Sequence, residues 1–296
     1  MRLGDLAATP AKSSPARSAG RSIGAILIDA GKLKPEDAER VLRAAQELGI
    51  RFGDAAKELG LITQQDIDVA LSRQFDYPYL IPGESVVSEE VVAAYEPFSR
   101  RVEALRVLRS QLLLRWFQTD PARKALAVVS ASRGEGRSFI AANLAVVFSQ
   151  LGRQRTLLID ADLRHPRQHQ LFGLDNRAGL SSVLSERAGG EVVRRIPGLL
   201  DLSVLPAGIL PPNPQELLAR PQFAKMLQQL AAYFDVILLD SPPASDSADA
   251  QTIAVSAGAT LMVVKKNASR AWRVRGVAGS VAEARATIVG AVLNDF

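Results

Sequence analysis

The segment Ser130–Asn143, SASRGEGRSFIAAN, contains the residue types and spacing needed to bind phosphate. It follows the apolar run Ala125–Val129 and leads into a second apolar run, so we expect a strand, a loop and a helix. In such a loop, successive backbone N–H groups point at phosphate oxygens, and the helix adds the positive end of its dipole. The loop fits the pattern [GA]-x4-G-K-[ST] except at Arg137, where lysine is expected. An ordinary strand-to-helix turn is the alternative.

Within this loop the glycines allow close approach of the backbone, and the Ser138 hydroxyl can ligate Mg²⁺. The residues expected around a nucleotide's phosphates are Arg133, Gly134, Glu135, Gly136, Arg137 and Ser138. Arg137 keeps the positive charge of lysine, but its guanidinium is larger and forked. Two hypotheses follow: Arg137 reaches the phosphates from a slightly altered loop, or the loop binds nucleotide without efficient turnover.

Three carboxylates follow predicted strands and accompany this loop. Asp160 and Asp162 come directly after the run Thr156–Ile159, and Asp240 ends the later run FDVILLD. A carboxylate at a buried strand end is costly unless it meets a cation. Mg²⁺, which prefers oxygen ligands and keeps several waters, supplies that cation when held through Ser138 and Asp240.

The elements that position these residues belong to an α/β fold. From residue 124 onward, apolar runs without polar alternation are separated by helical stretches, which predicts a mostly parallel sheet covered by helices on both faces. Nucleotide is then expected at the carboxyl ends of the strands. The expected strands are Leu126–Ser130, Thr156–Asp160, Leu202–Leu205, Val236–Leu239, Thr260–Val264 and Thr287–Leu293.

The first third of the chain has a different composition. Residues 1–20 are rich in Ala, Ser, Pro and Gly and are expected to be disordered. Residues 21–76 contain two similar units, in which Gly31 corresponds to Gly60, and each unit predicts a helix, a glycine turn and a second helix. Residues 77–97 contain Pro and Gly breakers and are expected to be a linker. Residues 98–296 then form the phosphate-binding domain.

Composition and charge exclude several classes of function. There is no cysteine, so disulfides and thiolate metal sites are excluded. Apolar runs do not reach the roughly 18 residues that span a bilayer, and the N-terminus has no apolar core typical of a secretory signal. The net charge of +5 is modest and no basic run is interleaved with aromatics, so nucleic acid is not an expected partner. His165 and His169 have no further histidine nearby, which disfavours a histidine metal site.

From about residue 98 to the end, the chain resembles the bacterial tyrosine kinases of polysaccharide export, which are P-loop ATPases related to MinD and ParA. The resemblance rests on SASRGEGRS as Walker A, LLIDADLRHP as Walker A′, VILLDSPP as Walker B and the segment LPAGILPPNPQELL. It implies ATP and Mg²⁺ as cofactors. It further implies a cytoplasmic protein held peripherally at the inner membrane by a chain-length-determinant partner that spans the membrane.

The resemblance also implies roles for individual residues. Ser138 and Asp240 are expected to hold Mg²⁺, with Asp160 behind them. Asp162 is expected to be the general base for a tyrosine hydroxyl, with Asp160 and Arg137 completing the catalytic set. Asn294 is expected near the adenine. The helix predicted over residues 98–117 carries an E-x2-R-x2-R pattern similar to the family's oligomerisation motif, formed by Glu103, Arg106 and Arg109.

The repeat in residues 21–76 resembles the N-terminal domain of type II secretion and pilus-assembly ATPases. Some of those domains bind cyclic di-GMP through tandem motifs that begin with arginine and end with glutamine. The second unit keeps Arg51 and Gln74, whereas the first has Ser22 in place of the arginine and Ala45 in place of the glutamine. A protein-docking or spacer module is therefore the favoured interpretation, and cyclic di-GMP is the alternative ligand.

Four functional hypotheses remain open. The first is an active tyrosine kinase that controls exopolysaccharide chain length or export. The second is a nucleotide switch with little catalysis, motivated by Arg137 and by the absence of tyrosines after Leu293. The third is an adaptor led by the N-terminal repeat. The fourth is a ParA-like ATPase that positions cargo, which the D-x-D-x-R motif of the A′ segment and the LPAG segment disfavour. The sequence has four tyrosines, Tyr77, Tyr79, Tyr95 and Tyr233. The first three lie in the predicted linker and could be phosphorylation substrates, but local packing is their favoured role.

Overall fold

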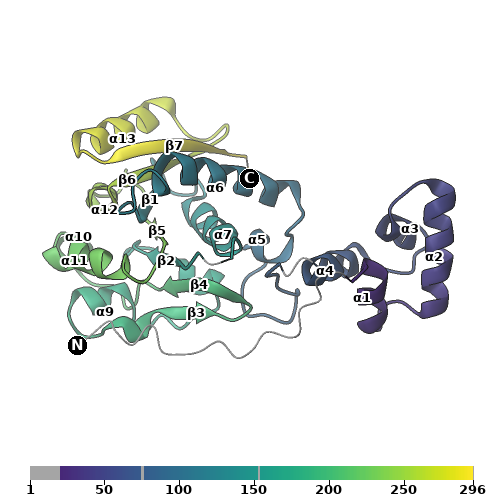
Figure 1. Ribbon diagram of the computed structural model, residues 1–296. Coiled ribbons are helices and arrows are strands. Elements are labelled where there is room, and N and C mark those ends of the chain that lie inside the picture. Colours follow the sequence, from purple (N-terminus) through teal and green to yellow (C-terminus); the bar gives the residue numbers. More distant parts are fainter. Residues whose placement is uncertain (1–20, 75–76, 153, 296) are drawn as a thin grey trace.

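A seven-stranded sheet forms the centre of the computed structural model, which describes residues 21–74, 77–152 and 154–295 (Figure 1). The strand order is β3-β4-β2-β5-β1-β6-β7, and neighbouring strands are parallel except for the antiparallel pair β3 and β4. The predicted α/β class with a mostly parallel sheet is confirmed. The strands are β1 (Ala125–Ser130), β2 (Thr156–Asp160), β3 (Arg194–Ile196), β4 (Leu199–Leu205), β5 (Val236–Asp240), β6 (Ala259–Lys265) and β7 (Thr287–Asn294).

Helices cover both faces of this sheet, because the central strands are apolar on both sides. In β1, Leu126 and Val128 face one core, and Ala127 and Val129 face the other. The first face is covered by α5 (Val92–Tyr95), α6 (Arg100–Leu112), the π-helical turn η2 (Leu113–Phe117) and α7 (Arg137–Ser149). The second is covered by α9 (Leu180–Leu184), α10 (Pro214–Leu218), α11 (Pro221–Leu230), α12 (Asp249–Ala257) and α13 (Ala271–Glu283).

Two elements differ from the sequence expectation. The edge strand β3 was not predicted, because it is three residues long and two of them are exposed arginines. The helix predicted over residues 98–117 is an α-helix only to Leu112 and continues as the π-helical turn η2, which places Trp116 so that its indole Nε1 donates to the Ala125 carbonyl at 2.9 Å. Two further short helices complete the body, α8 (Gln168–Leu171) and the 3-10 helix η3 (Gly190–Val192).

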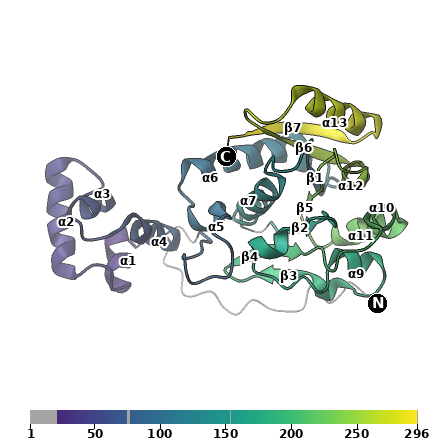
Figure 2. The ribbon, with the colours of Figure 1, turned by 180° about the vertical axis from the view of Figure 1, so that it is seen from behind.

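Four N-terminal helices pack around a core of their own and stand apart from the α/β body in both views (Figures 1 and 2). They are α1 (Ile23–Asp29), α2 (Pro35–Leu48), α3 (Phe52–Glu58) and α4 (Gln64–Gln74). Their shared core contains Leu27, Val41 and Ile67. Each repeat turns at a glycine in the left-handed region, Gly31 with φ +68° and Gly60 with φ +67°, where a side chain would be strained. The repeat in the sequence therefore corresponds to two helix pairs.

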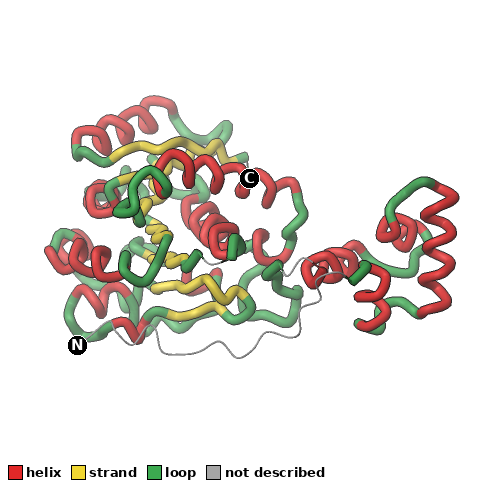
Figure 3. Tube along the Cα trace, viewed as in Figure 1, coloured by secondary structure: helices red, strands yellow, loops and turns green. Residues whose placement is uncertain are grey.

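The second helix of each pair begins at the residues that predicted a helix start. Pro35 occupies the first position of α2, where its missing N–H costs nothing. The Thr63 hydroxyl accepts from the Asp66 amide at 3.2 Å, and the Asp66 carboxylate accepts from the Thr63 amide at 2.9 Å. Two backbone N–H groups at the start of α4 are therefore satisfied reciprocally. Figure 3 shows that the described part of this region is helix and loop. Within the described ranges, the helices are too short or too polar to cross a bilayer.

The segment expected to be a linker, residues 77–97, lies along α7 and is bonded to it. The buried Asn143 amide on α7 donates to the Glu90 carbonyl at 3.1 Å and accepts from the Ala93 amide at 2.8 Å. At the end of α7, the Gln150 amide donates to the carbonyls of Pro78 and Ala93, each at 3.0 Å. These contacts hold the segment against the α/β body. The segment expected to be disordered, residues 1–20, lies outside the described residues.

Candidate active site

The phosphate loop joins β1 to α7 at the carboxyl end of the sheet. Gly134 and Gly136 adopt φ values of +78° and +96°, which turn the loop so that its amides precede the helix. The Glu135 carboxylate folds inward instead of facing solvent. It accepts from the Ser132 amide at 2.9 Å and from the Ser269 hydroxyl at 2.5 Å. The loop is therefore braced from within and tied to the segment after β6.

Arg137, the residue in the lysine position, is only 6% exposed and spans the mouth of the loop. Its Nε donates to the Ser241 carbonyl at 2.7 Å. One terminal nitrogen donates to the Ser130 hydroxyl at 2.6 Å and the Ser132 carbonyl at 3.1 Å. The other terminal nitrogen lies 3.9 Å from an Asp162 carboxylate oxygen. The forked guanidinium thus joins the loop, the end of β5 and the end of β2, which a single ammonium could not do at once.

Asp160 and Asp240 are register partners on the adjacent parallel strands β2 and β5, and both are fully buried. One oxygen of Asp160 accepts from the amides of Arg167 and Gln168, at 2.9 and 2.8 Å. One oxygen of Asp240 accepts from the Gln168 side chain at 2.7 Å. The second oxygen of each carboxylate has no hydrogen-bond partner. Two unpartnered anionic oxygens beside Ser138 fit a divalent cation.

The electrostatics of this pair agree with a site that takes a cation. Burial, together with the charge of Asp240, raises the pKa of Asp160 well above its ordinary value. Burial also raises the pKa of Asp240, whereas the charge of Arg137 and the hydrogen bond from Gln168 act to lower it. In the part of the chain that the structure describes, no group of three or more His, Cys, Asp or Glu side chains could hold a metal alone. The pair of carboxylates, Asp160 and Asp240, suits Mg²⁺, which takes one or two carboxylates plus water and phosphate.

Asp162 lies between the phosphate loop and the turn that follows β2. Its Oδ1 accepts from the amides of Arg164 and His165, at 3.1 and 2.8 Å, so the carboxylate is oriented by the backbone. Arg164 is in turn held by the fully buried Asp249 at the start of α12, with 2.8 Å between Nε and Oδ2. The Asp162 oxygen near Arg137 is the one left to face the loop. His165 therefore orients Asp162 through its backbone.

Gln168 and Asp249 are site residues that sequence reasoning missed. Gln168 is buried, and its side chain bonds both Asp240 and the Ser138 carbonyl, the latter at 3.2 Å. It lies in the short helix α8, 72 residues from Asp240 in the sequence. The only local signal was a polar residue a few positions after the A′ segment. Pairing Arg164 with Asp249 required knowing that α12 begins beside β2.

Asn294, expected near an adenine, lies at the end of β7 with 4% exposure. Its Nδ2 donates to the Glu135 carbonyl at 3.1 Å, and its Oδ1 has no hydrogen-bond partner. The remaining loop residues differ in exposure: Arg133 and Gly134 are exposed at the tip, and Ser138 is half-buried. The structure brings every predicted phosphate, metal and catalytic residue to one edge of the sheet.

The predicted oligomerisation residues lie elsewhere, on α6. The Arg106 guanidinium is 3.1 Å from Glu103 and also donates to the Tyr77 hydroxyl at 2.8 Å. Arg109 donates to the Val147 carbonyl near the end of α7. These three side chains therefore make contacts within the chain, at the opposite end of α7 from the phosphate loop.

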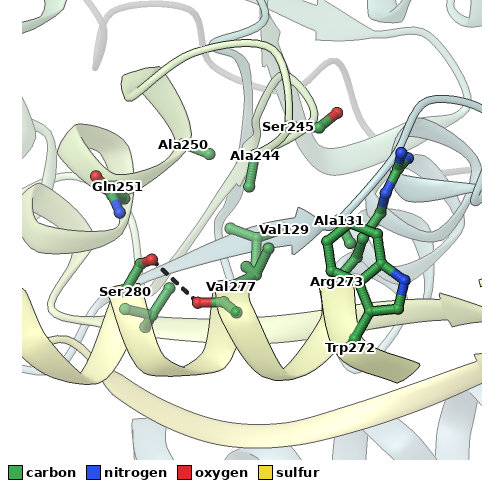
Figure 4. Close-up of a pocket in the computed structure, with 12 residues that line it drawn as sticks. Val129, Ala131, Ala244, Ser245, Ala250, Gln251, Trp272, Arg273, Val277 and Ser280 are labelled. Atoms are coloured by element: carbon green, nitrogen blue, oxygen red, sulfur yellow. Dashed lines mark hydrogen bonds between the residues drawn. The ribbon is translucent and has the colours of Figure 1, made fainter. Parts of the chain in front are cut away.

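A cavity of about 370 Å³ adjoins the loop on the other side of β1 (Figure 4). It lies between α13 and the segment after β5, and Val129, Ala131 and Val277 contribute apolar surface. Trp272 and Arg273 stand together at one end, and Arg273 also reaches the Ser132 hydroxyl at 3.3 Å. Its lining contains no carboxylate.

This site has the features of a P-loop nucleotide-binding protein: a strand, a phosphate loop with left-handed glycines, a helix and two strand-end aspartates. A family model described as ParA, NUBPL iron-transfer P-loop NTPase, matches residues 122–294. The tyrosine-protein kinase YwqD of Bacillus subtilis is 34% identical over 210 residues, covering 71% of this chain and 87% of that protein. The putative tyrosine-protein kinase CapB of Staphylococcus aureus is 33% identical over 67% of this chain and 86% of that protein.

Solved structures give the same result. The crystal structure of the chimerical protein CapA2B2 matches with a TM-score of 0.66 and 31% identity, over 76% of this chain and 97% of that one. The kinase domain of Escherichia coli tyrosine kinase ETK matches with a TM-score of 0.64 and 31% identity, over 69% of this chain and 79% of that one. The chain belongs to the bacterial tyrosine-protein kinases, a family of ParA-like P-loop NTPases.

The two loop glycines allow a matched test of how the loop is braced. A Cβ on Gly136 would lie 2.1 Å from the Asn294 Nδ2, whereas a Cβ on Gly134 would meet nothing within 4 Å. Both residues have positive φ, so both alanine variants carry backbone strain, on the order of 1–3 kcal/mol. We expect Gly136→Ala to lower the melting temperature more than Gly134→Ala, measured by thermal unfolding without nucleotide. Equal losses would mean that Asn294 does not brace the loop.

Proposed function

We propose that this chain is an ATP-dependent protein-tyrosine kinase whose centre is the loop 130–138 with Asp160, Asp162 and Asp240. The observation that carries the proposal is the convergence of three strand-end carboxylates on one phosphate loop, with one oxygen of Asp160 and one of Asp240 left unpartnered. Phosphoryl transfer needs mainly positioning and neutralisation of charge, and this set of groups provides both.

Binding of ATP follows from the loop. Its amides and the N-terminus of α7 take the phosphates, and Arg137 turns from the carbonyls of Ser132 and Ser241 toward them. The Ser138 hydroxyl and Asp240 would hold Mg²⁺, and Asp160, the register partner of Asp240, would support them; Mg²⁺ bound there would supply the positive charge that the phosphates need. The free Oδ1 of Asn294 is an acceptor that suits an exocyclic amine such as that of adenine.

Transfer to tyrosine follows from the position of Asp162. Its Oδ1 is held by two backbone amides, so the other oxygen is presented toward the loop at 3.9 Å from Arg137. That oxygen accepts the proton of the incoming tyrosine hydroxyl, while the loop and Arg137 hold the phosphoryl group in line. The pair of Asp249 and Arg164 keeps the turn that carries Asp162 in place.

The wider role that fits this chemistry is control of exopolysaccharide chain length or export. In this proposal the α/β body, residues 98–296, acts beneath a membrane-spanning chain-length determinant, which places the chain in the cytoplasm at the inner membrane. Self-association through Glu103, Arg106 and Arg109 would bring acceptor tyrosines to neighbouring centres. Residues 21–76 form a separate helical module for docking, joined by residues 77–97.

A nucleotide switch with little turnover is the second candidate, and one observation favours it. Arg137 satisfies its donors with carbonyls of its own loop and of Ser241, so ATP must compete with these contacts for the guanidinium. In this alternative, ATP binding would reposition the loop and the segment after β5 without phosphoryl transfer.

The two candidates are separated by incubating the purified chain with Mg-ATP, alone and with the cytoplasmic segment of the membrane partner. Phosphotyrosine is read by mass spectrometry, beside nucleotide binding measured by calorimetry. The kinase proposal expects phosphotyrosine in at least one condition. Bound ATP without phosphotyrosine in both conditions would contradict the kinase proposal and support the nucleotide switch.

Replacing Asp160, one of the paired carboxylates, should affect metal binding and folding stability in opposite directions. Because the pKa of Asp160 is raised in the folded chain, its ionisation opposes folding; this loss of stability grows as pH rises from the ordinary value of 3.8 through the raised pKa. In EDTA at neutral pH, Asp160→Asn should therefore raise the free energy of unfolding and flatten its dependence on pH.

The same variant should gain less stability from Mg-ADP than the wild type does, because the buried charge that supports the cation is gone. The measurement is thermal unfolding in EDTA and in excess Mg-ADP. Asp175→Asn, which changes an exposed carboxylate, is the control. A variant that is less stable in EDTA, or that keeps the full Mg-ADP gain, would contradict the assignment of Asp160.

A further inference from the structure

Tyr77 lies in an arginine environment that the phosphoryl-transfer centre does not use. Its hydroxyl donates to Gln150 Oε1 at 2.6 Å and accepts from Arg106 at 2.8 Å. The Arg106 guanidinium also covers the ring, with its central carbon 5.1 Å from the ring centroid. Tyr77 itself is half-buried, and its oxygen is already held by a cation.

A second arginine adds to this environment from the next turn of α6. Arg109 is half-buried, and its Nε is a buried donor without a hydrogen-bond partner. Burial lowers the pKa of Arg109, and its guanidinium donates to the Val147 carbonyl near the end of α7. A buried guanidinium donor without an acceptor is costly, and an added anion beside Tyr77 would supply the acceptor.

The other tyrosines of the described chain have different surroundings. Burial raises the pKa of Tyr79, and the charges of Asp68 and Glu96 raise it further, so an anion there would be repelled. Tyr95 is buried and its hydroxyl donates to the Val87 carbonyl. Tyr233 is half-buried at the end of α11, on the other face of the sheet. Two arginines therefore distinguish Tyr77 as a position that can receive a phosphate.

We propose that Tyr77 is a phosphorylation site whose phosphate is held by Arg106 and Arg109. The inference rests on the proposed kinase function. In the step, the Tyr77 oxygen forms a bond to the γ-phosphorus of ATP, the bond from that phosphorus to the bridging oxygen breaks, ADP leaves, and the phenolic proton passes to a base or to water. Phosphotyrosine adds a charge near −2, which two guanidinium groups can pair by bidentate bonds.

The position of Tyr77 requires that a second copy of the chain performs the transfer. Gln150, its hydrogen-bond partner, caps the C-terminus of α7, whereas the phosphate loop precedes the N-terminus of that helix. The helix has 13 residues, which separates its ends by about 20 Å. Reacting atoms must approach to about 3–3.5 Å. The chain's own centre therefore cannot reach Tyr77 in this arrangement.

Phosphorylation would change how residues 77–78 are attached to the body. The phosphate ester has no hydroxyl proton, so the bond from Tyr77 to Gln150 is lost, and the anion is repelled by the acceptor oxygen it formerly bonded. Gln150 also bonds the Pro78 and Ala93 carbonyls, so its loss of Tyr77 disturbs the junction between the helical module and the α/β body. Phosphorylated Tyr77 thus loses its hydrogen bond to Gln150 and is held by Arg106 and Arg109 instead.

The test is a trans-phosphorylation reaction between full-length chains. A tagged Asp162→Asn acceptor is mixed with untagged wild-type chain, Mg-ATP and a glutamate–tyrosine copolymer, and the acceptor's phosphopeptides are quantified. We expect occupancy at Tyr77 at least tenfold above that at Tyr79. A phosphorylated copolymer with an unmodified Tyr77 would overturn this inference and leave the kinase function standing. If neither is phosphorylated, the kinase function fails and the inference fails with it.

A second measurement tests the arginines. Acceptors carrying Arg106→Gln or Arg115→Gln are first phosphorylated with a large excess of wild-type chain, so that weaker self-association does not limit labelling, and are then treated with a tyrosine phosphatase. Arg115 is exposed on η2 and serves as the matched control. Removal of phosphate from Tyr77 should be several-fold faster in Arg106→Gln than in wild type, and unchanged in Arg115→Gln. Equal rates in the three proteins would mean that Arg106 does not hold the phosphate.

Discussion

Replacing Asp162 by asparagine is expected to lower the rate of phosphotyrosine formation at least about 100-fold, because a positioned general base commonly contributes that much or more. Asparagine can still accept the amides of Arg164 and His165, so the turn after β2 is expected to keep its shape. The measurement is the initial rate of transfer from ATP to a tyrosine peptide, with thermal unfolding as the check on folding.

Asp175→Asn is the matched control for this variant, because it removes one carboxylate from the exposed surface of the same part of the chain. Its rate should stay near that of the wild type. Nucleotide affinity should change little in Asp162→Asn, since Asp162 is assigned to the acceptor and not to the phosphates or the cation. A rate within a few-fold of the wild type would remove Asp162 from the mechanism.

Replacing Arg137 by alanine is expected to cost about 100- to 1,000-fold in the same rate, the loss typical of a preorganised donor at a developing charge. The variant also removes three bonds inside the chain and leaves the carbonyls of Ser132 and Ser241 without this donor. It should therefore be less stable, and its rate must be measured well below its melting temperature.

Arg137→Lys distinguishes loss of charge from loss of the forked geometry. If Arg137 replaces the usual lysine in function, the compact ammonium should restore the rate to within about tenfold of the wild type, because it still reaches the phosphates as a point charge. Arg133→Ala, at the exposed tip of the loop, should have a smaller effect than Arg137→Ala. An alanine variant at position 137 that retains the wild-type rate would contradict the role of Arg137.

The loop and its carboxylates could be predicted because each follows a buried strand, and parallel strands bring their carboxyl ends to one edge. Asp160 and Asp240 were expected together on this ground, and their strands are adjacent. The side chains that support them could not be predicted. Glu135 bonds Ser269 across 134 residues of sequence, a contact that depends on the packing of the segment after β6 against the loop.

The contacts of the α6 arginines Arg106 and Arg109 could not be predicted from the sequence either, because they too depend on long-range packing. Their spacing of three predicted one helical face, and the sequence favoured a salt-bridged surface or an oligomerisation motif. The structure adds Tyr77 and the end of α7, which come from elements that the sequence treated as a linker and a core helix. Short apolar runs predicted the central strands, but β3 has too few residues and too much charge to be recognised.

The central claim is that the loop with Arg137 and its three carboxylates transfers phosphate to tyrosine. The most direct measurement is a single-turnover reaction of the wild-type chain with γ-labelled Mg-ATP and a tyrosine peptide, followed by analysis of the labelled products. The account predicts label on tyrosine, dependent on Mg²⁺ and abolished by EDTA. Label that stays in bound ATP, or that appears only as free phosphate, would contradict it.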